Sequence, residues 1–134
     1  MPLVTLLVAG LHGLLLLVLL WPIVAARRGR RIGLGDGGDA ALLQRIRVHA
    51  NFVEYVPFAL LLLALLELSG LDRAWVALLG GSLFAARVLH AIGLSRSPGV
   101  SFGRLWGTAI TWGVILTASL VALVRAVVGL SGAA

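Results

Sequence analysis

The sequence predicts an all-α integral membrane protein folded as a four-helix bundle. Of its 134 residues, 60% are hydrophobic and only 12% are charged, whereas about 25% of the residues in soluble domains are charged. The mean hydropathy is +1.08, so the chain has too little polar surface to cover its apolar residues in water. The apolar residues form four runs, each long enough to cross a bilayer as a helix. We expect a single domain over residues 1–134.

Short polar segments separate the four apolar runs. The expected spans cover residues 3–26, 40–68, 73–94 and 104–130. The first run is too long for the core of a signal peptide, and no basic residue precedes it, so we interpret it as a true span. The arginine-rich segment 27–31 and the glycines after it predict a polar loop, with Asp39 in position to cap the second helix. Residues 69–72 predict a tight turn, and Pro98 and Gly99 a loop before the fourth helix.

The positions of the arginines predict how the chain is oriented in the membrane. All eleven basic residues are arginine, and four of them lie in the first loop. Arg96 and Arg104 flank the third loop, whereas the second loop contains only Arg73. The positive-inside rule therefore predicts that the first and third loops are cytoplasmic and that both termini lie outside the cytoplasm. Arg125, near the outer end of the fourth helix, is a counter-example, and we expect its side chain to snorkel to the interface.

Composition also limits the chemistry of the protein. There is no cysteine, so any thiol in its reactions must come from a ligand, and no protein thiolate is present to bind a metal. The net charge of +6 is compatible with nucleic-acid binding. However, the arginines lie at helix ends and within apolar runs, which fits membrane topology and an anionic ligand better. We therefore expect the bilayer as a partner, with no nucleic acid and no metal site.

A group of polar residues interrupts the second and third apolar runs. Arg47, Asn51 and Glu54 are separated by four and three residues, which puts them on one stripe of the second helix. Glu54 and Arg87 lie about equally far along the chain from the turn between their helices, so they should lie at the same depth. Either charge alone would cost at least about 2.5 kcal/mol in a membrane. We therefore expect Glu54 and Arg87 to pair.

The polar stripe cannot face lipid, so it must face other helices or a water-filled cavity. His49 and Arg45 point to another side of the same helix, and if that side is also covered by protein, we expect a second subunit to cover it. Such residues can also be purely structural, because hydrogen bonds between membrane helices contribute about 0.6 kcal/mol on average. We expect this role for His12 in the first helix. For His90, one turn beyond Arg87, both interpretations stay open.

Residues 47–57 carry the pattern R-x-x-x-N-x-x-E-Y-x-P. This pattern resembles the signature of the MAPEG family, the membrane-associated proteins in eicosanoid and glutathione metabolism. Five fixed polar or proline positions within an apolar span are improbable by chance. Residues 35–38 and 86–93 agree with the family, and the resemblance covers almost the entire chain. It points to the short bacterial branch, which implies a bacterial inner-membrane protein.

The resemblance implies a homotrimer that binds glutathione between neighbouring subunits, near the cytoplasmic side. One subunit would line the pocket with Arg47, Asn51, Glu54, Tyr55, Arg87 and His90. The neighbouring subunit would contribute His49 and Arg27 or Arg28. Arginines would bind the carboxylates of glutathione in a two-pronged geometry, and Glu54 would bind its ammonium group. A fixed arginine near the sulfur would lower the thiol pKa, because the thiolate is the nucleophile. Arg104 is the candidate for this catalytic role, and Arg96 is the alternative.

The family implies a glutathione-dependent transferase or peroxidase acting on lipophilic electrophiles dissolved in the bilayer, with glutathione as co-substrate. His90 and Leu94 stand where several glutathione-using relatives carry tyrosines. The alternative is therefore a non-catalytic trimer that binds another anionic or lipid-like ligand. A small multidrug exporter with four spans is least favoured, because it needs an acidic residue in the first helix, where His12 is the only ionisable residue of the apolar run.

Overall fold

The computed structural model describes residues 1–132 and confirms an all-helical chain. Its helices are α1 (Leu3–Arg30), α2 (Ala40–Leu68), α3 (Arg73–Arg96) and α4 (Phe102–Ser131). All four are long and apolar enough to cross a membrane. The prediction of four spans is therefore confirmed over the described part of the chain.

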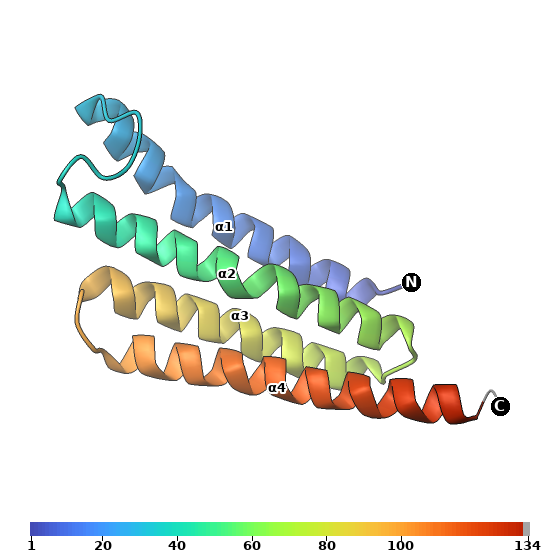
Figure 1. Ribbon diagram of the computed structural model, residues 1–134. Helices are drawn as coiled ribbons and strands as arrows, with labels where there is room; N and C mark the ends of the chain where they lie inside the picture. The colour runs from blue at the N-terminus through green and yellow to red at the C-terminus, as the bar shows by residue number, and fades with distance from the viewer. Residues whose placement is uncertain (133–134) are drawn as a thin grey trace.

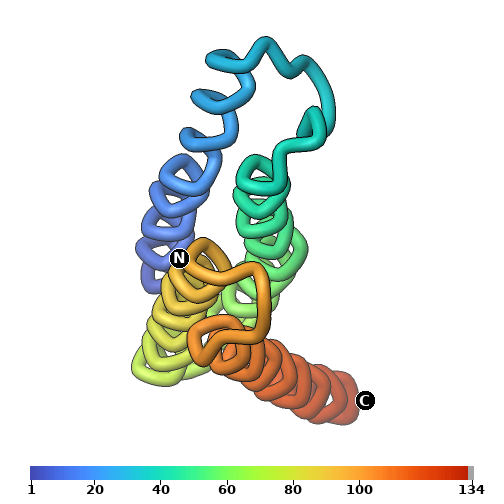
Figure 2. Tube along the Cα trace, turned by 90° about the vertical axis from the view of Figure 1, so that its left-hand side faces the viewer, coloured from blue at the N-terminus to red at the C-terminus, as the bar shows by residue number. Residues whose placement is uncertain are grey.

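The four helices run antiparallel in chain order (Figure 1). Helices α2 and α3 form the centre, and α1 and α4 each pack against both of them. We call the end with the α1–α2 and α3–α4 loops the loop end, and the end with both termini the terminal end. Figure 2 shows that α1 and α2 splay apart toward the loop end, where the connecting loop extends beyond the bundle.

The observed helices are longer than predicted at the loop end. Helix α1 continues through the first arginines to Arg30 and ends at Arg31, which adopts a left-handed conformation with φ 56°. Arginines in a last helical turn are favoured by the partial negative charge of the helix C-terminus, so the polar segment extends the helix. Helix α3 likewise continues to Arg96, and α4 begins at Phe102.

Acidic side chains cap three of the helices. Asp39 accepts hydrogen bonds from the backbone of Ala41 (2.9 Å) and Leu42 (3.2 Å), which confirms it as the N-cap of α2. Asp72 caps α3 in the same way. The first turn of α1 is capped from another helix. Glu67, at the end of α2, accepts hydrogen bonds from the backbone of Val4 and Thr5 and from the Thr5 hydroxyl.

Helices α3 and α4 approach each other closely through three glycines. A Cβ atom on Gly93 would lie 2.5 Å from the Arg104 backbone nitrogen, and one on Gly103 would lie 2.7 Å from the Leu89 carbonyl oxygen. One turn further along α4, a Cβ atom on Gly107 would lie 2.6 Å from the Cβ of His90. Small residues four positions apart are a common way to bring membrane helices into backbone contact. They bring the start of α4 against the end of α3.

The apolar surface of the bundle is divided between a narrow core and broad lipid-facing sides. Leu63 and Leu83 are fully buried between the central helices, beside Val114 of α4. By contrast, Leu14 is 65% exposed and Leu123 is 63% exposed. Such large exposed leucines are expected where helices contact lipid or another subunit.

Candidate functional site

A polar cleft of about 300 Å³ opens at the loop end, between α2, the end of α3 and the start of α4. Arg47 and Asn51 line it from α2, His90 from α3 and Arg104 from α4. These four residues were predicted from the sequence as site residues, and the fold brings them to one cleft. No carboxylate is among the residues that line it within the described chain. The cleft is therefore cationic and suited to an anionic group.

Arg104 is held by the loop that precedes its helix. Its Nη1 atom donates hydrogen bonds to the carbonyl oxygens of Pro98 (3.2 Å) and Gly99 (3.4 Å). Its backbone nitrogen donates to the Ser101 hydroxyl at 3.3 Å, which caps α4. Arg96 lies elsewhere, along a groove between α1 and α3. Of the two arginines considered for the thiolate, Arg104 therefore shares the cleft with the other site residues.

Arg87 does not line the cleft but contacts Asn51, which does, and it is 2% exposed. Its Nη1 atom donates to Asn51 Oδ1 at 2.9 Å, and its guanidinium lies 5.8 Å from the centre of the Tyr55 ring. Asn51 and Tyr55 are four residues apart, so they present the same face of α2 to α3. The Nε and Nη2 atoms of Arg87 have no hydrogen-bond partner among residues 1–132.

The predicted pairing of Glu54 with Arg87 is wrong within this chain. Glu54 Oε1 lies 3.9 Å from Nη1 of Arg47, and both side chains are more than half exposed. Glu54 is three residues after Asn51, which turns its side chain about 60° away from the face that meets α3. The position of a residue along its helix therefore did not determine which side of α2 faces Arg87.

The other predicted site residues lie away from the cleft. His49 is half-buried on another side of α2. Arg27, near the end of α1, donates to the Gly35 carbonyl oxygen of the following loop at 3.1 Å, while Arg28 is exposed. Arg45 donates to the Pro22 carbonyl oxygen at 3.3 Å. Arg45 thus contacts α1 of the same chain but is itself exposed, and cover of this side of α2 by a second subunit stays a prediction.

Gln44 contributes to the cleft, although the sequence analysis did not assign it a role. Its Nε2 atom donates to the carbonyl oxygens of Leu94 (2.6 Å) and Ser95 (3.2 Å), and so ties the start of α2 to the end of α3. The signal was available, because Gln44 lies three residues before Arg47 on the polar stripe. It helps to fix the distance between two walls of the cleft.

His12 has a packing role, as expected. It is 1% exposed, and its ring lies 5.3 Å from the ring of Phe84 and 6.0 Å from that of Phe52, measured between centroids. Its Nδ1 atom is 2.8 Å from the Val8 carbonyl oxygen, one turn earlier in α1. These contacts join α1 to both central helices. They do not direct His12 toward the cleft.

The fold and the cleft define a polytopic membrane protein with a cationic site at one end of its helices. The sequence model of the MAPEG family matches residues 5–124, and the chain belongs to this family. The inner membrane protein YecN of Escherichia coli K12 is 34% identical over 113 residues, which cover 84% of this chain and 85% of YecN. YecN of Escherichia coli O6:H1 gives the same values. With its four apolar helices, the chain is a multi-pass protein of the bacterial inner membrane.

Proposed function

We propose that this chain binds glutathione, or a closely related anionic thiol, in the loop-end cleft and transfers the thiolate to a lipophilic electrophile. The observation that carries the proposal is the convergence of Arg47 and Arg104, from different helices, on one cleft together with Asn51 and His90. Two guanidinium groups on one cleft, with no carboxylate among the residues described as lining it, favour a ligand with more than one negative charge. Family membership supports glutathione as the ligand class.

In the proposed mechanism, each group has one task. Arg47 binds a carboxylate of the tripeptide, and Asn51 offers its amide group to the peptide backbone. Arg104 lies nearest the thiol and stabilises the thiolate by charge, which lowers the thiol pKa. The thiol proton leaves to solvent. The sulfur then forms a bond to the electrophilic carbon, and the leaving group departs with the bonding electron pair.

We further propose that the active form is a homotrimer. A cleft of about 300 Å³ is at the lower limit for small-molecule sites, which typically enclose roughly 300–1,000 Å³. Arg47 and Glu54 also remain more than half exposed beside it. A neighbouring subunit that covered this surface would enclose the ligand and bring Glu54 and Tyr55 into the site. It would also bury part of the apolar surface of α1 and α4.

Thermal unfolding in detergent tests binding first. A ligand at a hundred times its dissociation constant adds about 2.7 kcal/mol to the free energy of unfolding if it binds only the folded state. We expect glutathione and S-hexylglutathione, which has no free thiol, both to raise the midpoint. If neither raises it at tens of millimolar ligand, the thiol proposal is refuted and the family assignment stands.

Conjugation with 1-chloro-2,4-dinitrobenzene tests the chemistry. We expect Arg104→Ala to reduce conjugation by at least about tenfold while the S-hexylglutathione shift remains, because the charge that stabilises the thiolate is lost. Arg96→Ala is the matched control, since it removes an arginine only eight positions earlier that does not line the cleft. Equal activity of the two variants would contradict the role of Arg104.

A non-catalytic protein that binds another anionic or lipid-like ligand is the second candidate. It is favoured by His90 and Leu94, which line the cleft where glutathione-using relatives carry tyrosines. Ligand-dependent stabilisation without conjugation of any tested electrophile would support it. The exporter hypothesis gains no support, because α1 contains no acidic residue.

A further inference from the structure

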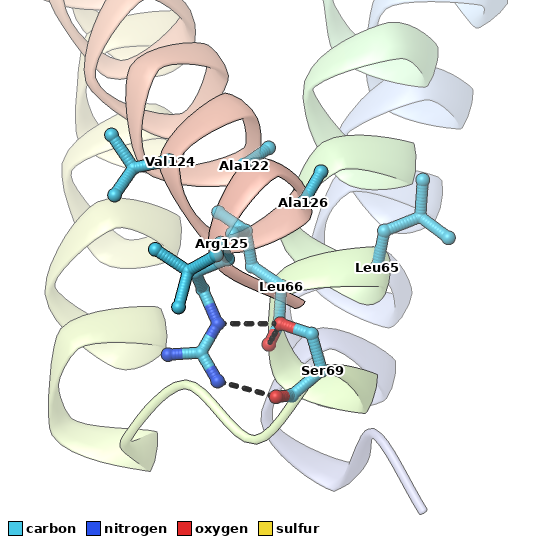
Figure 3. Close-up of a pocket in the computed structure, with 8 residues that line it drawn as sticks. Leu65, Leu66, Ser69, Ala122, Val124, Arg125 and Ala126 are labelled. Carbon is cyan, nitrogen blue, oxygen red and sulfur yellow. Dashed lines mark hydrogen bonds between the residues drawn. The ribbon is translucent and has the colours of Figure 1, made fainter. Parts of the chain in front are cut away.

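A second concave site lies at the terminal end, far along the helices from the polar cleft. It is a groove of about 580 Å³ between the last turns of α2 and α4 (Figure 3). Ala122 and Ala126, one turn apart on α4, line it with short side chains. Leu65, Val124 and Val128 line it and are each more than half exposed, so the groove is open toward lipid.

Arg125 lies at the polar end of this groove. Its Nε atom donates to the Ser69 hydroxyl at 3.0 Å, and its Nη2 atom donates to the Ser69 carbonyl oxygen. Figure 3 shows the third guanidinium nitrogen directed away from Ser69. A guanidinium has five N–H donors, so two contacts orient the group and leave the remaining donors for a ligand.

The carboxylates at the terminal end are engaged elsewhere. Glu67 accepts three hydrogen bonds from the first turn of α1, and Asp72 accepts one from the backbone of α3. The ion pairs found in residues 1–132 both lie toward the loop end and do not include Arg125. Arg125 therefore makes no ion pair with a carboxylate among residues 1–132, and the contacts described for it are with Ser69, the C-cap residue of α2.

We propose that this groove binds an anionic phospholipid, with an acyl chain along its apolar walls and the phosphate on Arg125. The planar donors of arginine match the geometry of a phosphate group, and basic residues at a membrane surface attract anionic lipids. A free phosphate ion would leave the apolar walls unused, and an uncharged lipid would leave the guanidinium without a counter-charge. The site does not depend on the function proposed for the loop-end cleft.

Native mass spectrometry of the detergent-solubilised full chain tests the proposal, because it counts bound lipids and subunits together. The wild type should retain phosphatidylglycerol more strongly than phosphatidylcholine with the same acyl chains. Arg125→Gln should weaken phosphatidylglycerol binding about fivefold, equivalent to about 1 kcal/mol, and leave phosphatidylcholine unchanged. Glutamine is chosen because its amide can still donate to Ser69. Arg73→Gln is the control, since Arg73 is an exposed arginine at the same end that does not line the groove.

A substitution that fills the groove tests the contribution of the acyl chain separately from that of the Arg125 charge. Ala126→Leu should reduce retention of both lipids, with helical content by circular dichroism equal to that of the wild type. Equal phosphatidylglycerol binding by Arg125→Gln and the wild type would overturn the proposal, as would displacement of the lipid by glycerol phosphate at equal concentration. A changed subunit count in Ala126→Leu, with unchanged lipid retention, would instead identify the groove as a contact between copies of the chain and overturn the lipid assignment.

Discussion

Substitution of Gly107 by alanine tests the close packing of α3 against α4. The added Cβ atom would lie 2.6 Å from the His90 Cβ and 2.7 Å from both the Ala86 carbonyl oxygen and the His90 backbone nitrogen. Carbon atoms in favourable contact are about 3.5–4.0 Å apart, so the helices must separate by roughly 1 Å. Two of the three close atoms belong to the backbone of α3, and a side-chain rotation cannot relieve those contacts.

The expected cost follows from two opposing effects. Forcing an extra carbon into a well-packed interface costs about 1–3 kcal/mol. Alanine also has a higher helix propensity than glycine, which raises the free energy of unfolding by up to about 1 kcal/mol. We therefore expect Gly107→Ala to lower the free energy of unfolding by about 1–2 kcal/mol, and the midpoint of thermal unfolding in detergent by several degrees. The stabilisation by S-hexylglutathione should also decrease, because separation of the helices moves Arg104 and His90 apart.

Gly113→Ala is the matched control on the same helix. A Cβ atom at Gly113 would meet no atom of this chain within 4 Å, so only the gain in helix propensity should remain. The expected result is a midpoint equal to or slightly above that of the wild type. If Gly107→Ala unfolds at the same temperature as Gly113→Ala, the backbone contact between α3 and α4 does not exist in the folded protein.

Three further substitutions test the polar contacts of α2. Asn51→Ala removes the hydrogen-bond acceptor of the buried guanidinium, and should lower the free energy of unfolding by about 1–3 kcal/mol. Glu54→Gln should change it by less than about 1 kcal/mol, because its pair with Arg47 is exposed; a larger loss than in Asn51→Ala would show that Glu54 is the partner of Arg87 after all. Glu67→Gln keeps the length of the side chain but removes the charge that caps α1. It should speed amide hydrogen exchange in the first turn of α1, and unchanged exchange there would rule out the cap.

The sequence was sufficient to predict the number and order of the helices, because long apolar runs can only span the bilayer as helices. It was less informative about where they end. The arginines after residue 26 predict a polar segment, but polar residues can continue a helix beyond the membrane, and α1 extends to Arg30. Local caps such as Asp39 could be predicted because the capping residue and the helix are adjacent in the sequence. The cap that Glu67 provides for α1 could not be predicted in this way, because its partners are more than 60 residues away in the sequence.

The candidate site was predictable to the extent that helical periodicity fixes neighbours on one helix. Arg47 and Asn51 share a stripe of α2 and do line one cleft. Contacts between helices depend also on how each helix is rotated about its axis, and this rotation decided that Arg87 meets Asn51 and not Glu54. Periodicity leaves that rotation undetermined whenever polar residues occupy more than one side, as they do at the start of α2.

Helix packing and site geometry cannot be separated in this protein. Gly93 contacts the backbone of Arg104, and Gly107 contacts His90, so the glycines that join α3 to α4 are in direct contact with two residues of the cleft. A side chain at either glycine would push α3 away from α4 and so move Arg104 away from His90. The loop that precedes α4 adds a second constraint, because its carbonyl oxygens hold the guanidinium of Arg104. A guanidinium group stabilises a thiolate by charge only if it stays close to the sulfur, because the electrostatic attraction falls with distance. The two hydrogen bonds from the loop to the exposed Arg104 therefore indicate a role in the cleft more strongly than its charge alone.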